Sequence, residues 1–364
     1  MDIIITGIQA RRAQRIARQK SPTLSLVRGM QPVEPRDVCP YELIQKTVRP
    51  TLEALGVVSQ SEPLQIRVFR PGAKTRRLDV KVHCTSATLP PQSFDLIVPS
   101  HSSLSYALHD SEVRIFVDGA CLCVLDIIQE KLNITKPNTN ERKIVPFAQG
   151  LALASEFCGL FSRDPFAPDV RDASFEIEPV IHIEELRLFA RGLQNSPGQR
   201  VLRDVLSYLA ERHGSPMEVM VYALAVVRSG LGGLHLPRPI VNRPLDLNKQ
   251  QLEQISHERL TPDLYWKQYE EVSEYDGSVH DTPQQIKEDK RRIVDYQTLG
   301  ITVFPATSVN FKSGDSIDEY MRALARHMEK HEGPALTRRM NRLFADGAHR
   351  RRRDLLGSTV RRCR

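Results

Sequence analysis

The sequence predicts an α/β protein whose C-terminal half combines a helix, a β-hairpin, a second helix and a closing strand. An aromatic segment, Leu264–Trp266, is separated by a polar break from an extended segment that carries Glu274 and Asp276. Two extended segments around such a break are typical of a hairpin. Apolar residues from Ile286 to Leu299 then recur at helical spacing. The buried-type residues at 301–304 predict the closing strand.

The N-terminal half predicts a separate α+β domain. Residues 64–68 and 78–82 alternate polar and apolar side chains around a Pro-Gly turn, which predicts a hairpin. Residues 94–98 and 113–117 supply two further strands. Residues 21–36 contain three prolines and indicate a loop. Helices are expected at 11–19, 41–55, 122–132, 147–161 and 181–191.

Chain length and composition shifts suggest several domains. A chain of 364 residues fits two or three domains at the usual size of roughly 100–200 residues each. We expect a basic N-terminal segment (1–30), an α+β accessory domain (31–162), a partly structured connection (163–200), a C-terminal α/β domain (201–335) and a basic, Arg-rich tail (336–364).

The composition is that of a globular, non-membrane protein. Hydrophobic residues make up 40% and charged residues 26% of the chain. No apolar run approaches the roughly 18 residues needed to cross a bilayer. The short apolar run near the N-terminus precedes its arginines, the reverse of a secretory signal. Six scattered cysteines do not form a disulfide framework, so we expect a cytoplasmic location.

Positive charge is concentrated at the two ends of the chain. Residues 336–364 contain ten arginines against two aspartates, and the first thirty residues carry a net charge of +5. Because the whole chain is +7, residues 31–335 are net negative. Basic arms around an acidic body suit contact with a phosphate backbone. The alternative is that the basic ends only keep the protein soluble.

Acidic residues are concentrated on the predicted hairpin. Glu274 and Asp276 are two positions apart, so both point to the same side of a strand. Asp263 would face that side from the neighbouring strand. Converging carboxylates are costly unless a cation neutralises them, and hard divalent ions bind oxygen ligands. A solvated strand face is the alternative, and we assign Glu270 and Glu271 to it.

The order of these residues resembles the PD-(D/E)XK, restriction-endonuclease-like domains of the group related to very-short-patch repair endonucleases. Those domains contain an acid, a strand that ends in E-x-D-G before a histidine, and a D-x-x-R helix. The matching residues are Asp263, Glu274 to Gly277, His280, and Asp289 with Arg292. The family's upstream helix contributes another glutamate, and Glu218 lies at that position. The resemblance covers about residues 202–307, a third of the chain.

The resemblance implies metal-dependent hydrolysis of nucleic-acid phosphodiester bonds. Asp263 and Glu274 would hold Mg²⁺ or Mn²⁺, and Glu218 or Asp276 would add a carboxylate in the inner or outer coordination sphere. His280 would also belong to the catalytic group. Duplex DNA is the expected partner. The residues expected to contact it are Lys290, Arg291, Arg350, Arg351, Arg352 and Arg353.

One departure from the family pattern affects the expected activity. The lysine that normally follows the second acid by two residues is absent, and Asp276 stands in its place. That lysine positions water or stabilises charge on the phosphate. His280, Lys290 or Arg291 could substitute for it. The alternative function is a non-catalytic, antitoxin-like DNA-binding regulator that uses a degenerate nuclease fold, and a protein–protein scaffold is a third.

The N-terminal half resembles, in layout alone, the accessory domain of abortive-infection antitoxin-type regulators. This layout implies a possible protein partner for residues 31–162. A soft-metal site built from His83, Cys84, Cys121, Cys123 and Cys158 is a further alternative. Their spacing is not that of a zinc knuckle, and cysteines without a metal commonly bury as small hydrophobic side chains.

Overall fold

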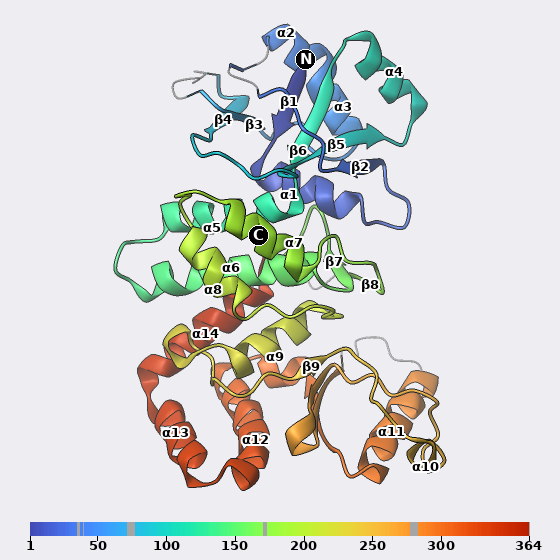
Figure 1. The fold of residues 1–364 in the computed structure, drawn as a ribbon, viewed down its shortest axis with the longest axis vertical. Coiled ribbons are helices and arrows are strands. Elements are labelled where there is room, and N and C mark those ends of the chain that lie inside the picture. Colours follow the sequence, from blue (N-terminus) through green and yellow to red (C-terminus); the bar gives the residue numbers. More distant parts are fainter. Residues whose placement is uncertain (35–36, 39, 71–76, 170–172, 277–282, 364) are drawn as a thin grey trace. The chain divides into compact units, whose positions relative to one another are not determined.

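The computed structural model describes residues 1–34, 37–38, 40–70, 77–169, 173–276 and 283–363, and it is a mixed α/β protein as predicted (Figure 1). The chain forms two compact units. The N-terminal unit comprises Met1–Thr135, Gln149–Leu209 and Arg362–Arg364, and the C-terminal unit comprises Lys136–Ala148 and Ala210–Arg361. The two units therefore exchange short segments, which the sequence-based boundaries did not anticipate.

The N-terminal unit is built on a six-stranded mixed sheet with strand order β2-β5-β6-β1-β3-β4. Its strands are β1 (Asp2–Ile5), β2 (Leu24–Arg28), β3 (Leu64–Val68), β4 (Val80–Cys84), β5 (Phe94–Pro99) and β6 (Arg114–Asp118). The apolar run at the N-terminus is the buried inner strand β1, parallel to β6. The region expected to be a loop at 21–36 contains β2, which pairs with β5 through its backbone.

The predicted hairpin of residues 64–68 and 78–82 is wrong in its direction. Strands β3 and β4 pair in parallel, with Leu64 opposite Val80. A two-stranded hairpin requires a tight reversal, whereas parallel strands require a longer crossover. The alternation of side chains in each strand is the same in both arrangements, so the sequence pattern could not distinguish them.

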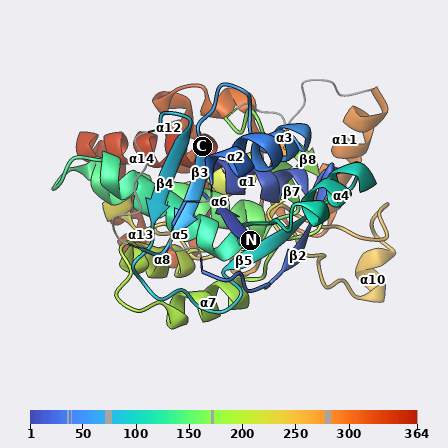
Figure 2. The ribbon, with the colours of Figure 1, turned by 90° about the horizontal axis from the view of Figure 1, so that it is seen from above.

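Helices surround this sheet and extend the unit (Figure 2). The helical elements are α1 (Gly7–Ile16), α2 (Tyr41–Leu43), a π-helical turn (Ile44–Val48), α3 (Arg49–Ala54), α4 (Ser102–Asp110), α5 (Ala120–Ile134), α7 (Ile183–Gly192) and α8 (Gln199–Leu206). Helix α6 (Asn140–Phe157) begins in the C-terminal unit and ends in the N-terminal unit. Strands β7 (Phe161–Arg163) and β8 (Ala173–Phe175) form a small antiparallel pair.

The basic N-terminal segment is part of the packed unit and is not a flexible arm. Three arginines of α1 are buried, and each contacts a glutamate from elsewhere in the unit. The pairs are Arg11–Glu130 at 3.1 Å, Arg12–Glu62 at 2.7 Å and Arg15–Glu156 at 2.8 Å. Buried charges persist when they are paired in this way. These three arginines are therefore neutralised by ion pairs within the fold and are not available to contact a nucleic acid.

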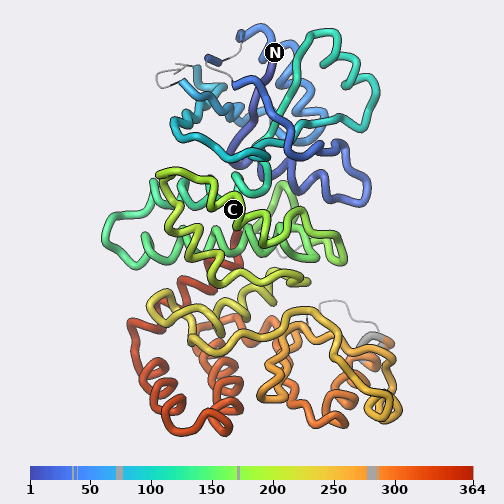
Figure 3. The backbone as a smooth tube through the Cα atoms, viewed as in Figure 1, coloured from blue at the N-terminus to red at the C-terminus, as the bar shows by residue number. Residues whose placement is uncertain are grey.

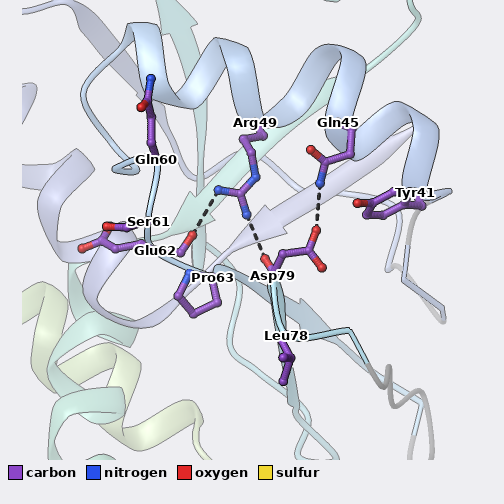
Figure 4. A pocket seen from close by; sticks show the side chains of 9 residues that line it. All are labelled: Tyr41, Gln45, Arg49, Gln60, Ser61, Glu62, Pro63, Leu78 and Asp79. Atoms are coloured by element: carbon purple, nitrogen blue, oxygen red, sulfur yellow. Dashed lines mark hydrogen bonds between the residues drawn. The ribbon is translucent and has the colours of Figure 1, made fainter.

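Helix α3 is tied to the sheet edge through a single arginine (Figure 4). The Arg49 guanidinium donates to the backbone oxygens of Glu62 at 3.0 Å and Asp79 at 2.8 Å. Gln45 donates to the Asp79 carboxylate at 2.8 Å. These bonds form the floor of an open hollow of about 400 Å³ beside Tyr41. Because the polar groups at the floor of the hollow bond to one another, we assign these hydrogen bonds a structural role in holding α3 to the sheet edge.

The C-terminal unit contains a four-stranded sheet with strand order β12-β11-β10-β9. The strands are β9 (Ile240–Val241), β10 (Leu264–Trp266), β11 (Glu271–Asp276) and β12 (Thr302–Thr307). Strand β10 is antiparallel to both neighbours, and β11 is parallel to β12. The predicted order of helix, hairpin, helix and strand is confirmed, with α9 (Pro216–Val226) and α11 (Pro283–Thr298) as the two helices.

Helices cover both faces of this sheet. On one face, Tyr296 of α11 packs with Val272 and donates to Glu274 at 3.0 Å. On the other face, Ser273 hydrogen-bonds at 2.7 Å to Tyr320 of α12 (Gly314–Glu332). Alternate residues of β11 therefore face opposite helices, as the two-residue period of a strand requires. Short elements complete the unit: η2 (Ser229–Leu231), α10 (Lys249–Leu252), η3 (Lys267–Tyr269) and η4 (Ser308–Phe311).

The expected basic tail is helical and packed. Residues 336–361 lie in α13 (Pro334–Ala345) and α14 (Gly347–Arg361), and α14 packs along α9. Leu356 and Val360 of α14 are fully buried. The chain then returns to the N-terminal unit, where Gln149 donates to the Arg362 carbonyl at 2.7 Å (Figure 3). Within the described ranges, no helix is long and apolar enough to cross a membrane.

Candidate carboxylate site

Asp263 and Glu274 lie directly opposite each other on the β10–β11 hairpin. The register pairs Leu264 with Ser273, and its continuation pairs Asp263 with Glu274. The Asp263 N–H donates to Glu274 Oε1 at 3.4 Å, and Asp263 Oδ2 accepts from the Tyr275 N–H at 2.7 Å. Residues opposite each other in an antiparallel pair project to the same side. The structure thus brings these two predicted site residues together.

Glu218 approaches from the first turn of α9. Its helix begins with Ser215, whose hydroxyl accepts from the Glu218 N–H as an N-cap. Glu218 Oε2 accepts from the Gly214 N–H at 2.7 Å and from Asn242 Nδ2 at 2.5 Å. The Asn242 N–H in turn donates to the Asp263 carbonyl. Asn242 was not predicted, and it links Glu218 to the hairpin.

Glu218 and Glu274 are buried and Asp263 is half-buried, and the Asp263 charge disfavours the charged forms of the other two. Burial raises the pKa of Asp263, Glu218 and Glu274, and the Asp263 charge raises the pKa of the other two further. Desolvation always disfavours the charged form of an acid, and a nearby negative charge adds to this effect. The cluster would therefore gain from a cation placed among its oxygens.

Arg292 is the cation that contacts Glu274. Its Nη2 lies 3.3 Å from Glu274 Oε2 and 3.2 Å from Asp289 Oδ1. Tyr296, one turn later on α11, donates to Glu274 Oε1. Arg292 and Tyr296 are four residues apart and so share a helix face, which is the sequence signal that identifies this contact.

The basic residues that were expected to replace the absent lysine lie elsewhere. Lys290 is exposed on α11. Arg291 is also exposed and lies 3.7 Å from Glu288 on the same helix. Asp276 ends β11 as an exposed residue, on the same side of the strand as Glu274. The predicted catalytic residue His280 lies outside the described residues.

Three of the four consecutive arginines of α14 are engaged in ion pairs. Arg350 contacts Asp315 at 2.5 Å and Arg352 contacts Asp346 at 3.4 Å. Arg353 is fully buried and pairs with Asp318. Arg351 is exposed. The predicted nucleic-acid contact of this run is thus reduced mainly to Arg351.

His257 binds two acids of α11, a contact that the sequence analysis missed. His257 Nδ1 lies 2.5 Å from Asp295, and its Nε2 lies 2.8 Å from Glu288. The hydrogen bond with Asp295 raises the pKa of His257. Asp295 also accepts from the Ser256 N–H. These contacts fix the segment before β10 onto α11, on a helix face next to that of Arg292.

The donor set suits a hard cation, but it is not gathered into a complete metal site. Three carboxylates supply the oxygen ligands that Mg²⁺ and Mn²⁺ bind. Among the described residues, no three His, Cys, Asp or Glu side chains lie close enough to hold a metal ion. This applies equally to the described cysteines and to His83. A cation at the hairpin would therefore have to draw the carboxylates closer together when it binds.

No family model matches this sequence, and no curated protein or solved structure matches it significantly.

Proposed function

We propose that the C-terminal unit is a metal-dependent phosphodiesterase of restriction-endonuclease-like architecture that acts on nucleic acid. Its support in the fold is the strand order, with antiparallel β10 beside the parallel pair β11 and β12 and helices on both faces. The acids lie where the hairpin strands meet. This order of strands and helices supports the proposed architecture. The proposed activity rests on the side chains of the site, because one fold can carry many functions.

The observation that carries the proposal is the direct opposition of Asp263 and Glu274. Glu218 lies near enough to Asp263 for the Asp263 charge to raise the pKa of Glu218. Asp263 and Glu274 would hold Mg²⁺ or Mn²⁺. Glu218 would have to move closer to add a third carboxylate, because no three such side chains among the described residues lie close enough to hold an ion. When bound, such an ion lowers the pKa of a water molecule and stabilises negative charge on phosphate oxygens. The hydrogen bonds use Oδ2 of Asp263 and Oε2 of Glu218, so the second oxygen of each is the expected ligand.

Arg292 would supply the positive charge that the family's lysine normally provides. Its guanidinium orients Glu274 and lies beside the cluster, where a phosphate oxygen would carry charge. Arginine stays protonated, so it can stabilise charge but cannot accept the proton of an attacking water. Proton transfer would therefore fall to a carboxylate of the cluster or to solvent.

A non-catalytic, nucleic-acid-binding regulator is the second candidate. It is favoured by the Arg292–Glu274 ion pair, which already neutralises one acid without a metal. The lack of a preassembled three-ligand group within the described residues favours it as well. Under this function the nuclease-like architecture would only position a nucleic acid.

The substitution Glu274→Gln tests the proposal. It preserves shape and removes one negative charge, so a metal nuclease should lose cleavage by about a hundredfold or more. The measurement is cleavage of plasmid and short duplex DNA with Mg²⁺ or Mn²⁺, with purified parent and variant prepared in parallel. Glu319→Gln, an exposed change on α12, is the matched control and should cleave like the parent.

The outcomes separate the two functions. Equal cleavage by the parent and Glu274→Gln would place the activity in a contaminant or at another site. If neither protein cleaves any substrate, while both bind duplex DNA without metal, the regulator is supported. In that case Glu274→Gln should bind DNA more tightly, because a charge that repels phosphate has been removed.

A further inference from the structure

The N-terminal unit contains a second cavity of about 420 Å³, far in sequence from the carboxylate site. It lies where the end of β2, the segment before β5, the start of α5 and one face of α7 meet. Its lining includes Arg28, Asp95, Cys121, Glu185, Leu188 and Phe189. This volume is within the usual range of small-molecule pockets, roughly 300–1,000 Å³.

A buried carboxylate with neutral hydrogen-bond donors lies at the bottom of this cavity. Asp95 is 2% exposed. Its oxygens accept from Gln14 Nε2 at 2.7 Å and from the Gly29 N–H at 3.3 Å. Neither donor carries charge. Burial raises the pKa of Asp95, and the nearby Arg28 charge lowers it. Among the residues that the structure describes, Asp95 forms no ion pair, so its charged form favours the binding of a positive group.

The charges at the rim do not cancel the charge of Asp95. Arg28 pairs with Glu185 at 2.9 Å, and both side chains are partly exposed. With this pair balanced, the lining carries a net charge of −1 from Asp95. Burial raises the pKa of the Cys121 thiol to about 12, so the thiol stays neutral and adds no charge near pH 7.

The remaining walls are apolar and closely built. Pro90, Leu188 and Phe189 supply carbon surface to the lining. The backbone of Gly192 approaches Pro90 so closely that an added Cβ would lie 3.0 Å from that ring. Gly29 has a φ of +70°, a conformation that favours glycine. These contacts hold the walls around the cavity.

We propose that this cavity binds a small ammonium compound with an apolar body. The ammonium group donates to Asp95, and the apolar body packs against Pro90, Leu188 and Phe189. A few polar groups that fix orientation within apolar walls are what small-molecule sites provide. An anion with the same apolar body should bind more weakly, because the Asp95 carboxylate repels it. This binding function is independent of the proposed phosphodiesterase.

Binding of phenethylammonium chloride to the full-length protein tests the proposal. Isothermal titration calorimetry at pH 7 should give saturable binding with one site per chain. The anion 3-phenylpropanoate carries a carboxylate on the same phenethyl body. It should bind at least about tenfold more weakly, because it loses the charged hydrogen bond to Asp95 and is repelled by it. Equal binding of the two compounds, or no saturable binding of the ammonium compound, would overturn the proposal.

Two variants locate the site. Asp95→Asn removes the charge at the bottom and should weaken phenethylammonium binding about tenfold or more. Leu188→Arg adds a positive charge on an exposed wall residue, where folding is not at risk, and should weaken it as well. Ile134→Arg adds the same charge at the exposed far end of α5 and is the matched control. Binding that is unchanged in Leu188→Arg, or lost equally in Ile134→Arg, would exclude this cavity.

Discussion

At the scale of single residues, Glu271 differs most from its expected role. The sequence places it on a solvated strand face beside Glu270, whereas the structure buries it completely. Within the described residues, neither of its carboxylate oxygens has a hydrogen-bond partner. Glu271 shares its side of β11 with Ser273, which faces α12. The sequence pattern gave no sign that a later helix covers this side.

The substitution Glu271→Gln should stabilise the protein in neutral and alkaline solution. Burial raises the pKa of Glu271 to about 8, so the folded state favours the protonated form. An unfolded glutamate titrates near pH 4.3. Between these values the folded state binds more protons than the unfolded state, so stability falls as pH rises through this range.

Glutamine resembles the protonated acid and removes this pH dependence. We expect a gain of about 1–3 kcal/mol in the free energy of unfolding at pH 8 and little change near pH 4. Chemical denaturation at several pH values measures the difference. Glu270→Gln, the exposed neighbouring change, should show no such trend. An equal effect of Glu271→Gln at both pH extremes would contradict the assignment.

At the scale of elements, the sequence was informative where the signal was local. The hairpin of β10 and β11, helix α11 with its Gly300 stop, and the Ser215 cap of α9 all follow from neighbouring residues. The opposition of Asp263 and Glu274 follows from the same hairpin. The contact of Arg292 with Glu274 was accessible from helical spacing but requires knowing which face α11 presents.

The elements whose environment or direction was predicted wrongly are those that contact residues far away in the sequence. Arginine patterns in α1 and α14 look solvated, because the sequence does not show that Glu130, Glu156 and Asp318 meet them in the fold. Long arginine side chains also bury their carbon stems while pairing their ends. The parallel direction of β4 likewise depends on the path of the connection and not on the strand itself.

Leu356→Ala in α14 should destabilise the C-terminal unit. Leu356 is fully buried in the helix that packs along α9, which carries Glu218. Removing a buried leucine side chain costs about 2–5 kcal/mol. Thermal unfolding followed by circular dichroism measures the loss. Arg351→Ala, an exposed change on the same helix, should leave the midpoint within about 1 °C, since surface changes are usually near neutral.

The variant Arg351→Ala also distinguishes an effect on folding from an effect on nucleic-acid binding. If Arg351 contacts phosphate, Arg351→Ala should reduce the salt dependence of DNA binding by about one released counterion without loss of stability. Deleting residues 336–364 would remove α13 and α14 together, so it would unfold the site as well as remove charge. An unchanged melting midpoint in Leu356→Ala would contradict the packed role of α14.

At the scale of the whole molecule, the net charge of +7 is distributed differently from a body with two basic arms. Much of the positive charge at both ends is paired within folded units. Ion pairs cancel over short distances, so they contribute little to attraction of a polyanion. Of the residues predicted to contact nucleic acid, Lys290, Arg291 and Arg351 are exposed.

The two units are also not successive segments of the chain. Residues 136–148 belong to the C-terminal unit, and residues 362–364 belong to the N-terminal unit. A single cut in the chain therefore cannot give two fragments that each contain one complete unit. The stability of the N-terminal unit should depend on residues at the far end of the sequence.

Deleting residues 362–364 should weaken the N-terminal unit, although the deletion is far from it in sequence. The deletion removes the Arg362 carbonyl that accepts from the buried side chain of Gln149, and it removes the buried Cys363. Loss of a buried hydrogen bond and of a small buried side chain costs about 1–3 kcal/mol. Hydrogen exchange should therefore speed up in residues 149–163 and in α1, where Arg15 lies near Cys363.

Arg362→Ala is the matched control for this deletion. It keeps the backbone carbonyl and changes only an exposed side chain, so it should leave hydrogen exchange unchanged. If the deletion alters exchange only in the C-terminal unit, the last residues do not belong where the structure has them.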